Sequence, residues 1–552
     1  MDYIHDLSVF EIKGKTVIEH LVLNNGMSYW WMTLLVEKGL YNTPISSVLR
    51  LFAIEEIILQ TRPNTLQIVG AEPIIARSIK NICHKYQVQF IVNKLKKHNK
   101  KINLKFLYKK LPLQIQSVVT LLRYLYQYRF LQKLKNTTWF SGDDAIFFCS
   151  YFNNIDDRCL KQGVFYSQYW QSLHKLLDDA KIKTNWLQLY VPNDAVPNYK
   201  TALKLLNWIN HKNDTQWHAF IHNYFDLTIF WHVCKQWLWL NVKSWHLRSL
   251  KEKLWPISFL EWSLSIRGPI AIQNLLFKEL FNKALKGIPY QHKGFYLCEN
   301  QAWERALIYS WRQYQHGTLI GVAHSTVRYW DLRYFTAIRT IKLKNNSIPL
   351  PDLLAVNGKI ALSHFQKIQY PQHLIVECEA LRYSYLKKYQ AIKYNVKQDK
   401  KILIFGDYHA AVNQQLFAML TIALTYCTDK MYFYIKPHPN CSVNIIDFES
   451  LKLTLVTESI NTILKEFDMV YASNVTSAAV DSYFYGLPTI IMLDKQDLNF
   501  SPLREQFGVS FVSTPKELAT ALHATHTNKK TKADDFFFFD PIFTRWMQLI
   551  KN

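Results

Sequence analysis

Two short motifs in the C-terminal half carry residue types that can bind a phosphate group. Lys436, His438 and Pro439 stand in a turn directly after residues 431–435 (MYFYI), an apolar run typical of a buried strand. The second motif, residues 473–477 (SNVTS), follows another apolar run and opens a short helical segment. The start of a helix offers unpaired N–H groups and the positive end of the helix dipole, which favour an anion. Two strand ends and a helix start at one edge of a parallel sheet therefore predict a phosphate-binding site.

Within these motifs, we expect the imidazole and the hydroxyl groups to contact the phosphate. His438 would donate a hydrogen bond to it, and Lys436 stands in the same turn as a cation. Ser473, Thr476 and Ser477 would add hydroxyl and backbone donors. Helix capping explains one such hydroxyl, but not three in five positions.

A third apolar run, residues 401–405, ends in Gly406 and Asp407 just before a predicted helix. Gly406 allows a tight turn between strand and helix and a close approach of the backbone to a ligand. Asp407 can cap the helix, or it can contact the ribose or base of a nucleotide. The sequence leaves both roles open.

Two further strand ends carry residues suited to proton transfer. Glu299 follows residues 294–298, and His324 follows residues 318–323. A carboxylate at such a position can remove the proton from an acceptor hydroxyl if its surroundings raise its pKa toward neutrality. We therefore expect Glu299 to be the general base, with His324 as a second candidate base or phosphate contact. Glu304, about one helical turn further on, is expected to cap the helix or pair with an arginine.

Two arginines are weaker candidates for binding a carboxylate of the donor or acceptor. Arg267 stands at the start of a predicted helix, where an exposed surface cation is an equally good interpretation. Arg504 ends the run LNFSPLR at residues 498–504. No Asp-x-Asp pair stands at a strand end, where a nucleotide diphosphate would need Mg²⁺. We therefore expect no metal and no cofactor, and a nucleoside monophosphate as the activating group.

The elements that must position these residues alternate between short apolar runs and helical patterns, which predicts an α/β fold with parallel sheets. A chain of 552 residues exceeds one ordinary core. We expect two Rossmann-like domains that face each other across a cleft. Residues 1–385 would form the acceptor-side domain with helical insertions, and residues 386–535 the nucleotide-sugar domain. Residues 536–552 would form a helix that crosses back to the first domain. The predicted strands span residues 16–23, 65–69, 89–92, 145–152, 186–191, 294–298, 318–323, 401–405, 431–435, 453–456, 469–472, 489–493 and 509–512.

The formal net charge of +24 is unevenly distributed. Residues 73–142 contain fifteen Lys and Arg and no Asp or Glu, and residues 111–135 read as an amphipathic helix. A basic segment beside such a helix favours an anionic membrane surface, although a solvated basic face is the alternative. No nucleic-acid-binding motif is found, so nucleic acid is not an expected partner. Residues 225–250 contain several tryptophans, but charged residues interrupt them, and we expect a buried aromatic helix there.

The N-terminal sequence has no signal-peptide pattern, and no run of apolar residues is long enough to span a membrane. Eight cysteines are scattered without metal-binding or paired spacing, which indicates free thiols in a reducing compartment. We therefore expect a cytoplasmic protein that associates peripherally with the inner face of the cell membrane.

Several long motifs resemble a bacterial family of surface carbohydrate biosynthesis proteins. They span residues 294–312, 321–335, 379–383, 473–488 and 498–504. That family is similar to glycosyltransferases of the GT-B architecture. Its histidine-proline motif and the following serine motif resemble those of bacterial sialyltransferases and capsule-linker Kdo transferases.

The resemblance implies a CMP-activated nine- or eight-carbon ulosonic acid donor, inversion at the anomeric carbon and no metal. His438 and Pro439 match the histidine-proline motif, and Ser473, Thr476 and Ser477 match the serine motif. The implied acceptor is a lipid-linked oligosaccharide or another bacterial surface glycan such as lipopolysaccharide.

The chain departs from the sialyltransferase pattern at the base. Those enzymes carry it in an acidic-acidic-glycine motif, whereas here Gly142, Asp143 and Asp144 stand in the reverse order. The choice of Glu299 therefore depends on its position at a strand end. The alternatives are a Kdo transferase or a polyol-phosphate transferase of surface polysaccharide synthesis, or a non-catalytic scaffold at the membrane.

Overall fold

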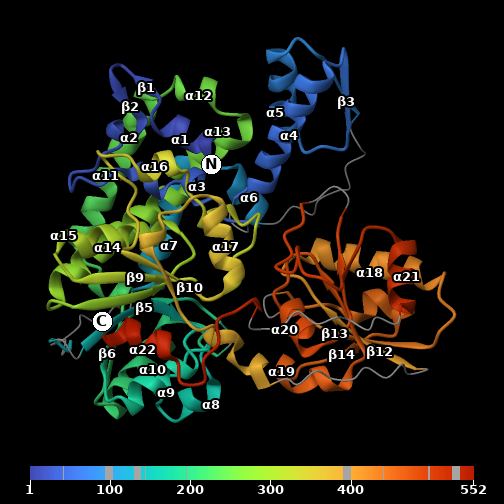
Figure 1. Cartoon of the computed structure of the whole chain (residues 1–552). Coiled ribbons are helices and arrows are strands. Elements are labelled where there is room, and N and C mark those ends of the chain that lie inside the picture. Colours follow the sequence, from blue (N-terminus) through green and yellow to red (C-terminus); the bar gives the residue numbers. More distant parts are fainter. Residues whose placement is uncertain are drawn as a thin grey trace. The chain divides into compact units, whose positions relative to one another are not determined.

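The computed structural model forms two compact units, each with its own parallel sheet (Figure 1). It describes residues 1–40, 43–93, 104–129, 139–142, 145–193, 195–388, 399–438, 441–494, 498–524 and 535–551. The first unit comprises Met1–Val322, Leu332–Ala355 and Ile368–Ile375. The second comprises Ala323–Asp331, Val356–Lys367 and Val376–Asn552.

The first unit is built around a seven-stranded sheet in the order β11-β10-β9-β8-β5-β6-β7. Counted along the chain, the first strand lies beside the fourth, which is the strand order of a doubly wound Rossmann sheet, with its switch point between β5 and β8. Strand β5 (AIFFCSYF) is buried along nearly its whole length, because a central parallel strand is covered on both faces. The strands are β5 (Ala145–Phe152), β6 (Lys183–Tyr190), β7 (Gln216–Phe220), β8 (Lys293–Leu297), β9 (Thr318–Val322), β10 (Leu353–Val356) and β11 (Ile375–Glu377).

The second unit is built around a six-stranded parallel sheet in the order β14-β13-β12-β15-β16-β17. This is again the Rossmann order, with the switch point between β12 and β15. One face packs on α18 and α21, and the other on α20 and residues 536–537 (Figure 1). The strands are β12 (Lys400–Phe405), β13 (Met431–Lys436), β14 (Thr454–Leu455), β15 (Met469–Ser473), β16 (Thr489–Met492) and β17 (Val509–Val512). The helices are α17 (Lys359–Lys367), α18 (Ala410–Leu424), α19 (Ile460–Ile463), α20 (Ala478–Tyr485), α21 (Pro515–His523) and α22 (Thr544–Lys551).

Helices of the first unit surround its sheet, and two small sheets stand apart from it. The helices are α1 (Asp2–Ser8), α2 (Val17–His20), α3 (Leu34–Glu37), α4 (Ile45–Thr61), α5 (Pro73–Lys85), α6 (Leu104–Lys110), α7 (Leu113–Gln127), α8 (Asp157–Lys161), α9 (Ser172–Asp179), α10 (Tyr199–Lys212), α11 (Leu227–His246), α12 (Leu250–Lys253), α13 (Pro256–Ile266), α14 (Pro269–Gly287), α15 (Ala302–Gln313) and α16 (Ile338–Ile341). The small sheets pair β1 (Glu11–Ile12) with β2 (Lys15–Thr16), and β3 (Thr65–Val69) with β4 (Gln89–Asn93). Together with α4 and α5, the β3–β4 sheet forms a small apolar cluster that also includes Ile257 of α13 (Figure 1).

The predicted fold class, α/β with two Rossmann-like domains, is confirmed by the strand order of both sheets. The predicted strand over residues 16–23 is wrong. Thr16 and Glu19 form a capping box, with the Thr16 N–H donating to Glu19 Oε2 at 2.7 Å, and this starts the helix α2 instead. The helix predicted over residues 225–250 exists as α11, but it is not buried on all sides: Trp231 and Trp245 are mostly exposed.

The compact units are discontinuous in sequence, unlike the division expected at residue 385, which stays a prediction. Residues near the C-terminus pack within the second unit on Glu379 and Ala380. Trp546 Nε1 donates to the Glu379 carbonyl at 3.0 Å, and the Ala380 N–H donates to the Phe538 carbonyl at 2.9 Å. The C-terminal segment thus returns to residues that the sequence-based division places before its boundary.

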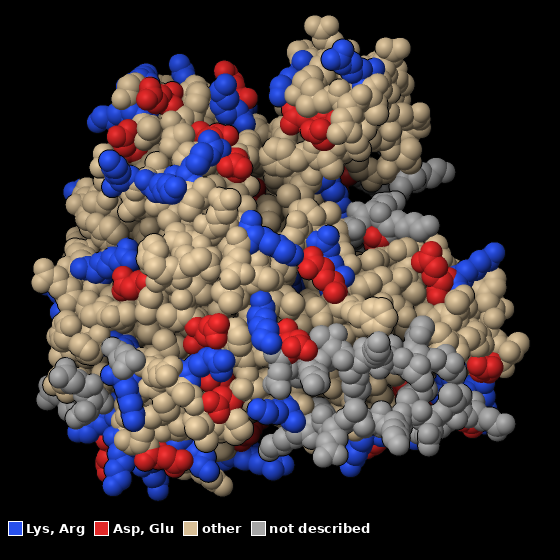
Figure 2. Space-filling model, in the orientation of Figure 1, with Lys and Arg blue, Asp and Glu red and all other residues tan. Residues whose placement is uncertain are grey.

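The surface carries both signs of charge, and on the face shown in Figure 2 basic and acidic side chains are interspersed. The excess of cations is therefore not gathered into one patch on that face. The parts of the basic segment 73–142 at residues 94–103 and 130–138 lie outside the described residues, as do Asp143 and Asp144. Of the helices that the structure describes, none combines the length and the hydropathy needed to cross a bilayer.

Candidate functional site

The carboxyl ends of β12 and β15 meet at the switch point of the second sheet. Asp407, two residues past the end of β12, is almost fully buried, and its Oδ2 accepts a hydrogen bond from Ser473 Oγ at 2.5 Å. Its Oδ1 accepts the His409 N–H at 2.8 Å, and the Asn413 side chain pairs with the Asp407 backbone. Asp407 therefore braces the turn before α18 but does not cap that helix, whose N-cap residue is His409. A contact of Asp407 with the ribose or base of a nucleotide stays a prediction.

The turn after β13 comes close to Gly406. The Gly406 N–H donates to the Lys436 carbonyl at 3.0 Å, and a Cβ at Gly406 would lie 3.2 Å from Pro437 Cα and 3.3 Å from the His438 nitrogen. The absence of a side chain at Gly406 thus lets the turn after β13 lie close to the end of β12. Burial lowers the pKa of His438, and the nearby Asp407 carboxylate opposes that shift. The imidazole is consequently neutral at pH 7 before a ligand arrives.

The start of α20 lies directly after β15 and carries the serine motif. Ser477 is the N-cap residue, but its hydroxyl does not cap the helix; it accepts a hydrogen bond from Arg328 Nη2 at 3.0 Å instead. Thr476 Oγ1 accepts the Ala478 N–H at 3.4 Å, a long and weak contact. Gly486 ends the helix in the left-handed conformation (φ 101°), as expected from its type. The structure thus brings a buried guanidinium to a helix N-terminus, an arrangement that attracts an anion.

The remaining residues predicted for the phosphate site have different surroundings. The ammonium of Lys436 donates to the main-chain carbonyls of Thr457 and Glu458, so it ties β13 to the segment after β14. Pro439 lies outside the described residues. Arg504 stacks on an aromatic ring, with its Cζ 4.3 Å from the centroid of Tyr329, the residue next to Arg328.

At the switch point of the first sheet, Glu299 follows β8 and is partly buried. Gln301 Nε2 donates to Glu299 Oε2 at 2.8 Å, and Arg333 Nη1 lies 3.9 Å from the same oxygen. Asn300 adopts a positive φ of 56°, which a short polar side chain tolerates, and its Oδ1 accepts from Arg305 Nη2 at 3.0 Å. Gln301 therefore fixes the Glu299 carboxylate, and Arg305 fixes the Asn300 side chain in the same turn.

Glu304 forms the expected cap of α15. Its Oε1 accepts the N–H groups of Glu299 at 2.9 Å and Gln301 at 2.8 Å, in a capping box with Gln301. Full burial raises the pKa of Glu304 to about 8, so this side chain is mostly protonated at pH 7. Glu304 thus fixes the backbone that carries Glu299.

A pocket of about 340 Å³ opens beside Gln301 in the first unit. The N-terminal part of α14 and the N-cap residue of α15 contribute amides, α3 contributes a carboxylate, and two aromatic rings complete the lining. Such a set can hydrogen-bond several hydroxyl groups while the rings contact C–H surface, so it suits a polyhydroxylated ligand. These lining residues include Glu37, Gln273, Asn274, Phe277, Gln301 and Trp303.

Two other predicted site residues, His324 and Arg267, lie directly after a strand and at the end of a helix. His324 follows the last residue of β9 by two positions, and the Ser325 carbonyl beside it accepts from Asn357 Nδ2 at 3.1 Å. Arg267 ends α13; its guanidinium donates to Ser263 Oγ at 3.2 Å, so it braces its own helix end. Among the described residues, no group of three His, Cys, Asp or Glu side chains is placed to hold a metal ion.

Sequence reasoning missed Arg328 and Gln301. Arg328 stands 149 residues from Ser477 in the chain, in a loop after β9, so only the fold brings the two together. The one available signal was its place in the motif of residues 321–335. A second pocket, of about 430 Å³ beside β14 and α19, contains none of the predicted site residues.

No protein-family model matches the chain, and no curated protein matches its sequence. Solved structures with a similar arrangement include Anabaena Alr3699/HepE in complex with UDP and glucose, at 10% identity over 68% of this chain and 88% of that one, with a TM-score of 0.34. The calicheamicin glycosyltransferase CalG4 is 7% identical over 70% and 90% of the two chains, with a TM-score of 0.37. The UDP-N-acetylglucosamine 2-epimerase of Rickettsia bellii is 8% identical over 68% and 86%, also with a TM-score of 0.37. Likenesses at this level carry no argument, and the fold class rests on the strand order of the two sheets.

Proposed function

We propose that this protein is an inverting, metal-independent glycosyltransferase. It moves a nonulosonic acid of the sialic, legionaminic or pseudaminic type from CMP to a bacterial surface glycan. The observation that carries the proposal is the meeting of Gly406, Asp407 and Ser473 with His438 and the start of α20 at one switch point. The choice of CMP and of the sugar depends on the motif resemblance described above.

On the donor side, the nucleotide phosphate binds at the start of α20. His438 donates one hydrogen bond to it, and the guanidinium of Arg328, already bonded to Ser477, supplies positive charge. Donors aimed at a departing phosphate stabilise the charge that develops in the transition state. Because an anion next to the imidazole raises its pKa, binding takes up a proton, and affinity for the phosphate falls as pH rises through that pKa.

On the acceptor side, the pocket beside Gln301 holds the acceptor sugar. Glu299 removes the proton from the attacking hydroxyl as the oxygen bonds to the anomeric carbon of the donor sugar. The bond from that carbon to the phosphate oxygen breaks, and its electron pair leaves with CMP. Gln301 orients the Glu299 carboxylate through their 2.8 Å hydrogen bond.

A binding and turnover experiment on His438→Ala tests the donor assignment. Wild-type protein is expected to gain thermal stability with CMP, and less with UDP, GDP or CDP-glycerol. The variant should lose that gain and lower kcat by roughly 10²–10³, the usual effect of removing one charge-stabilising donor. His211→Ala, which removes an exposed imidazole from α10, is the matched control and should behave as wild type.

Other outcomes identify the alternatives. Stabilisation by CDP-glycerol but by no CMP compound would indicate a polyol-phosphate transferase. Stabilisation by no nucleotide at all would overturn the proposal and favour a non-catalytic protein. Near-wild-type turnover in His438→Ala would remove the residue from the mechanism.

A further inference from the structure

Helix α7 exposes one apolar face to solvent. Leu122 is 58% exposed and Tyr126 is 68% exposed, and Ile115, Val118 and Val119 are exposed as well. These positions recur at intervals of three and four residues, so they lie on one side of the helix. The opposite side carries Gln116, Ser117 and Leu121, which are buried.

Helix α11 exposes a similar face with larger side chains. Trp231 is 66% exposed and Trp245 is 70% exposed, and between them Leu238 and Val242 are exposed at the same helical face. The buried residues of α11 are Ile229, Val233 and Leu240. A monomeric soluble protein seldom exposes so many large apolar side chains together, and such patches mark interaction surfaces.

Both helices pack on α14 in the first unit. Ser117 Oγ of α7 and Trp237 Nε1 of α11 donate to the same acceptor, the Arg267 carbonyl, at 2.8 and 3.2 Å. Tyr124 of α7 also packs edge-on against Phe225, just before α11, with ring centroids 5.3 Å apart. The inner sides of α7 and α11 therefore meet at the segment around Arg267, which places the two helices near each other on the first unit.

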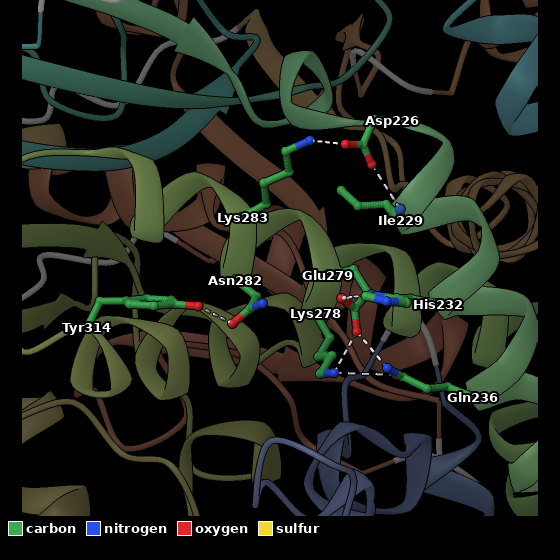
Figure 3. A network of polar contacts seen from close by, with 9 residues as sticks. All are labelled: Asp226, Ile229, His232, Gln236, Lys278, Glu279, Asn282, Lys283 and Tyr314. Carbon is green, nitrogen blue, oxygen red and sulfur yellow. Dashed lines mark hydrogen bonds and ion pairs between the residues drawn. The ribbon is translucent and has the colours of Figure 1, made fainter.

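A polar network fixes α11 to α14 on its inner side. Figure 3 shows Gln236 and His232 of α11 pointing toward Glu279 of α14. Gln236 Nε2 donates to Glu279 Oε1 at 2.6 Å, and His232 Nδ1 lies 3.4 Å from Glu279 Oε2. Near the start of α11, Asp226 forms an ion pair with Lys283 of α14. These contacts fix the inner side of α11 to its own unit, and Trp231 and Trp245 lie on the other side of the helix.

The segments that form these two helices carry basic but no acidic side chains. Residues 104–129 and 227–251 contain no Asp or Glu. Cations lie over the aromatic rings: Arg129 Cζ is 3.8 Å from the centroid of Tyr126, and Arg248 Cζ is 5.9 Å from that of Trp245. Long basic side chains that follow aromatic rings in this way can leave the ring in an apolar layer and keep the charge in a polar one. The described basic side chains of the region are Lys109, Lys110, Arg123, Arg129, Lys235, Lys243, Arg248 and Lys251.

We propose that the exposed faces of α7 and α11 form a docking surface for an anionic lipid bilayer. The apolar side chains enter the boundary between headgroups and acyl chains, and the lysines and arginines contact anionic headgroups. The proposal does not depend on the donor or acceptor assigned above. A second copy of the chain is a poorer occupant, since two such surfaces would place like charges opposite each other.

Co-sedimentation with lipid vesicles tests the surface directly. Full-length protein should bind vesicles that contain phosphatidylglycerol, and bind phosphatidylcholine vesicles much less. Added salt should weaken the binding because it screens the charges. The double variant Trp231→Ser/Trp245→Ser should reduce partitioning about tenfold or more, given the apolar area of two indoles. Trp208→Ser, which removes a partly exposed tryptophan from α10, is the matched control and should bind as wild type.

A second variant separates charge from apolar contact. Lys235→Glu/Arg248→Glu keeps both tryptophans and should abolish the preference for anionic vesicles. All variants should melt as wild type, since the altered side chains are exposed. Absence of vesicle binding by the wild type, or unchanged binding in both double variants, would overturn the proposal. So would a dimer in sedimentation velocity that Trp231→Ser/Trp245→Ser abolishes, because the surface would then join two copies.

Discussion

The two sheets share one strand order, but their switch points hold different side chains. In the first unit, large aromatic and amide groups meet near the carboxyl ends of β5 and β8: Tyr151 Oη donates to Gln301 Oε1 at 3.2 Å, and Trp303 Nε1 donates to Tyr151 Oη at 3.0 Å. In the second, β12 and β15 end in small residues, Gly406 and Ser473, and the backbone turns come close together.

This difference in side-chain volume gives the two switch points different capacities to bind ligands. Small residues expose backbone N–H groups and a helix N-terminus, which suit a phosphate. Bulky neutral groups form a pocket wall and orient one carboxylate, Glu299, which suits a hydroxyl-bearing ligand and proton transfer. A doubly wound strand order favours ligand binding at the switch point, and the side chains at the strand ends would determine which ligand fits there.

Glu299→Gln should reduce activity most. It tests whether proton transfer depends on the switch point of the first sheet while CMP binding does not. Gln keeps the shape and can still pair with Gln301, but it cannot accept the hydroxyl proton. We expect kcat to fall by about 10²–10⁴, the usual contribution of a general base. The thermal shift caused by CMP should stay unchanged, in contrast to His438→Ala.

Loss of CMP binding in Glu299→Gln would show that the switch points of the two sheets do not have separate roles. Retained turnover with an unchanged pH profile would remove Glu299 as the base and favour His324. A kinetic pH profile together with the CMP thermal shift distinguishes these outcomes.

A second prediction concerns Glu304, whose pKa burial raises to about 8 from its ordinary value of 4.5. The folded protein binds this proton more tightly than the unfolded chain. Stability is therefore greatest below pH 4.5 as far as Glu304 is concerned, and it falls as pH rises toward 8. The change is on the order of 5 kcal/mol in the free energy of unfolding, at about 1.4 kcal/mol per pKa unit.

Glu304→Gln should flatten this part of the pH dependence, since the amide cannot ionise and its oxygen still caps α15. Urea melts at several pH values between 5 and 8 measure the difference between wild type and variant. Glu261, whose pKa burial also raises to about 8, remains in both proteins and cancels. Identical slopes would contradict the burial of a protonated acid at this position.

The sequence could predict most strands of both sheets, because a parallel strand covered on both faces needs a continuous apolar run. The run over residues 145–152 matches β5 residue for residue. Strand β7 was missed because Gln216 and His218 interrupt its apolar pattern; both are buried and hydrogen-bonded to other side chains. Strands β10 and β11 were missed, and each has only three or four residues.

The candidate site was predictable where its residues follow strands directly. Glu299, Asp407 and Ser473 stand where their spacing after apolar runs indicated. Contacts between distant segments were not predictable, because no local pattern encodes them. The Arg328 bond to Ser477 and the turn of Lys436 toward two main-chain carbonyls are set by packing alone.

The smallest expected effect comes from Gly406→Ala, which sharpens the argument about side-chain size. The added Cβ would meet Pro437 Cα at 3.2 Å and the His438 nitrogen at 3.3 Å, so the turn after β13 must shift by a few tenths of an ångström. Stability should change by no more than about 1 kcal/mol, since the crowding is partly offset by the lower entropy of the unfolded chain. Affinity for CMP should nevertheless fall several-fold, because His438 moves with the turn.

Gly287→Ala, where a new Cβ would have no atom within 4 Å, is the matched control and should bind CMP as wild type, as measured by calorimetry. Equal CMP affinity in both variants would show that the small size of residue 406 does not determine how the switch point of the second sheet binds phosphate.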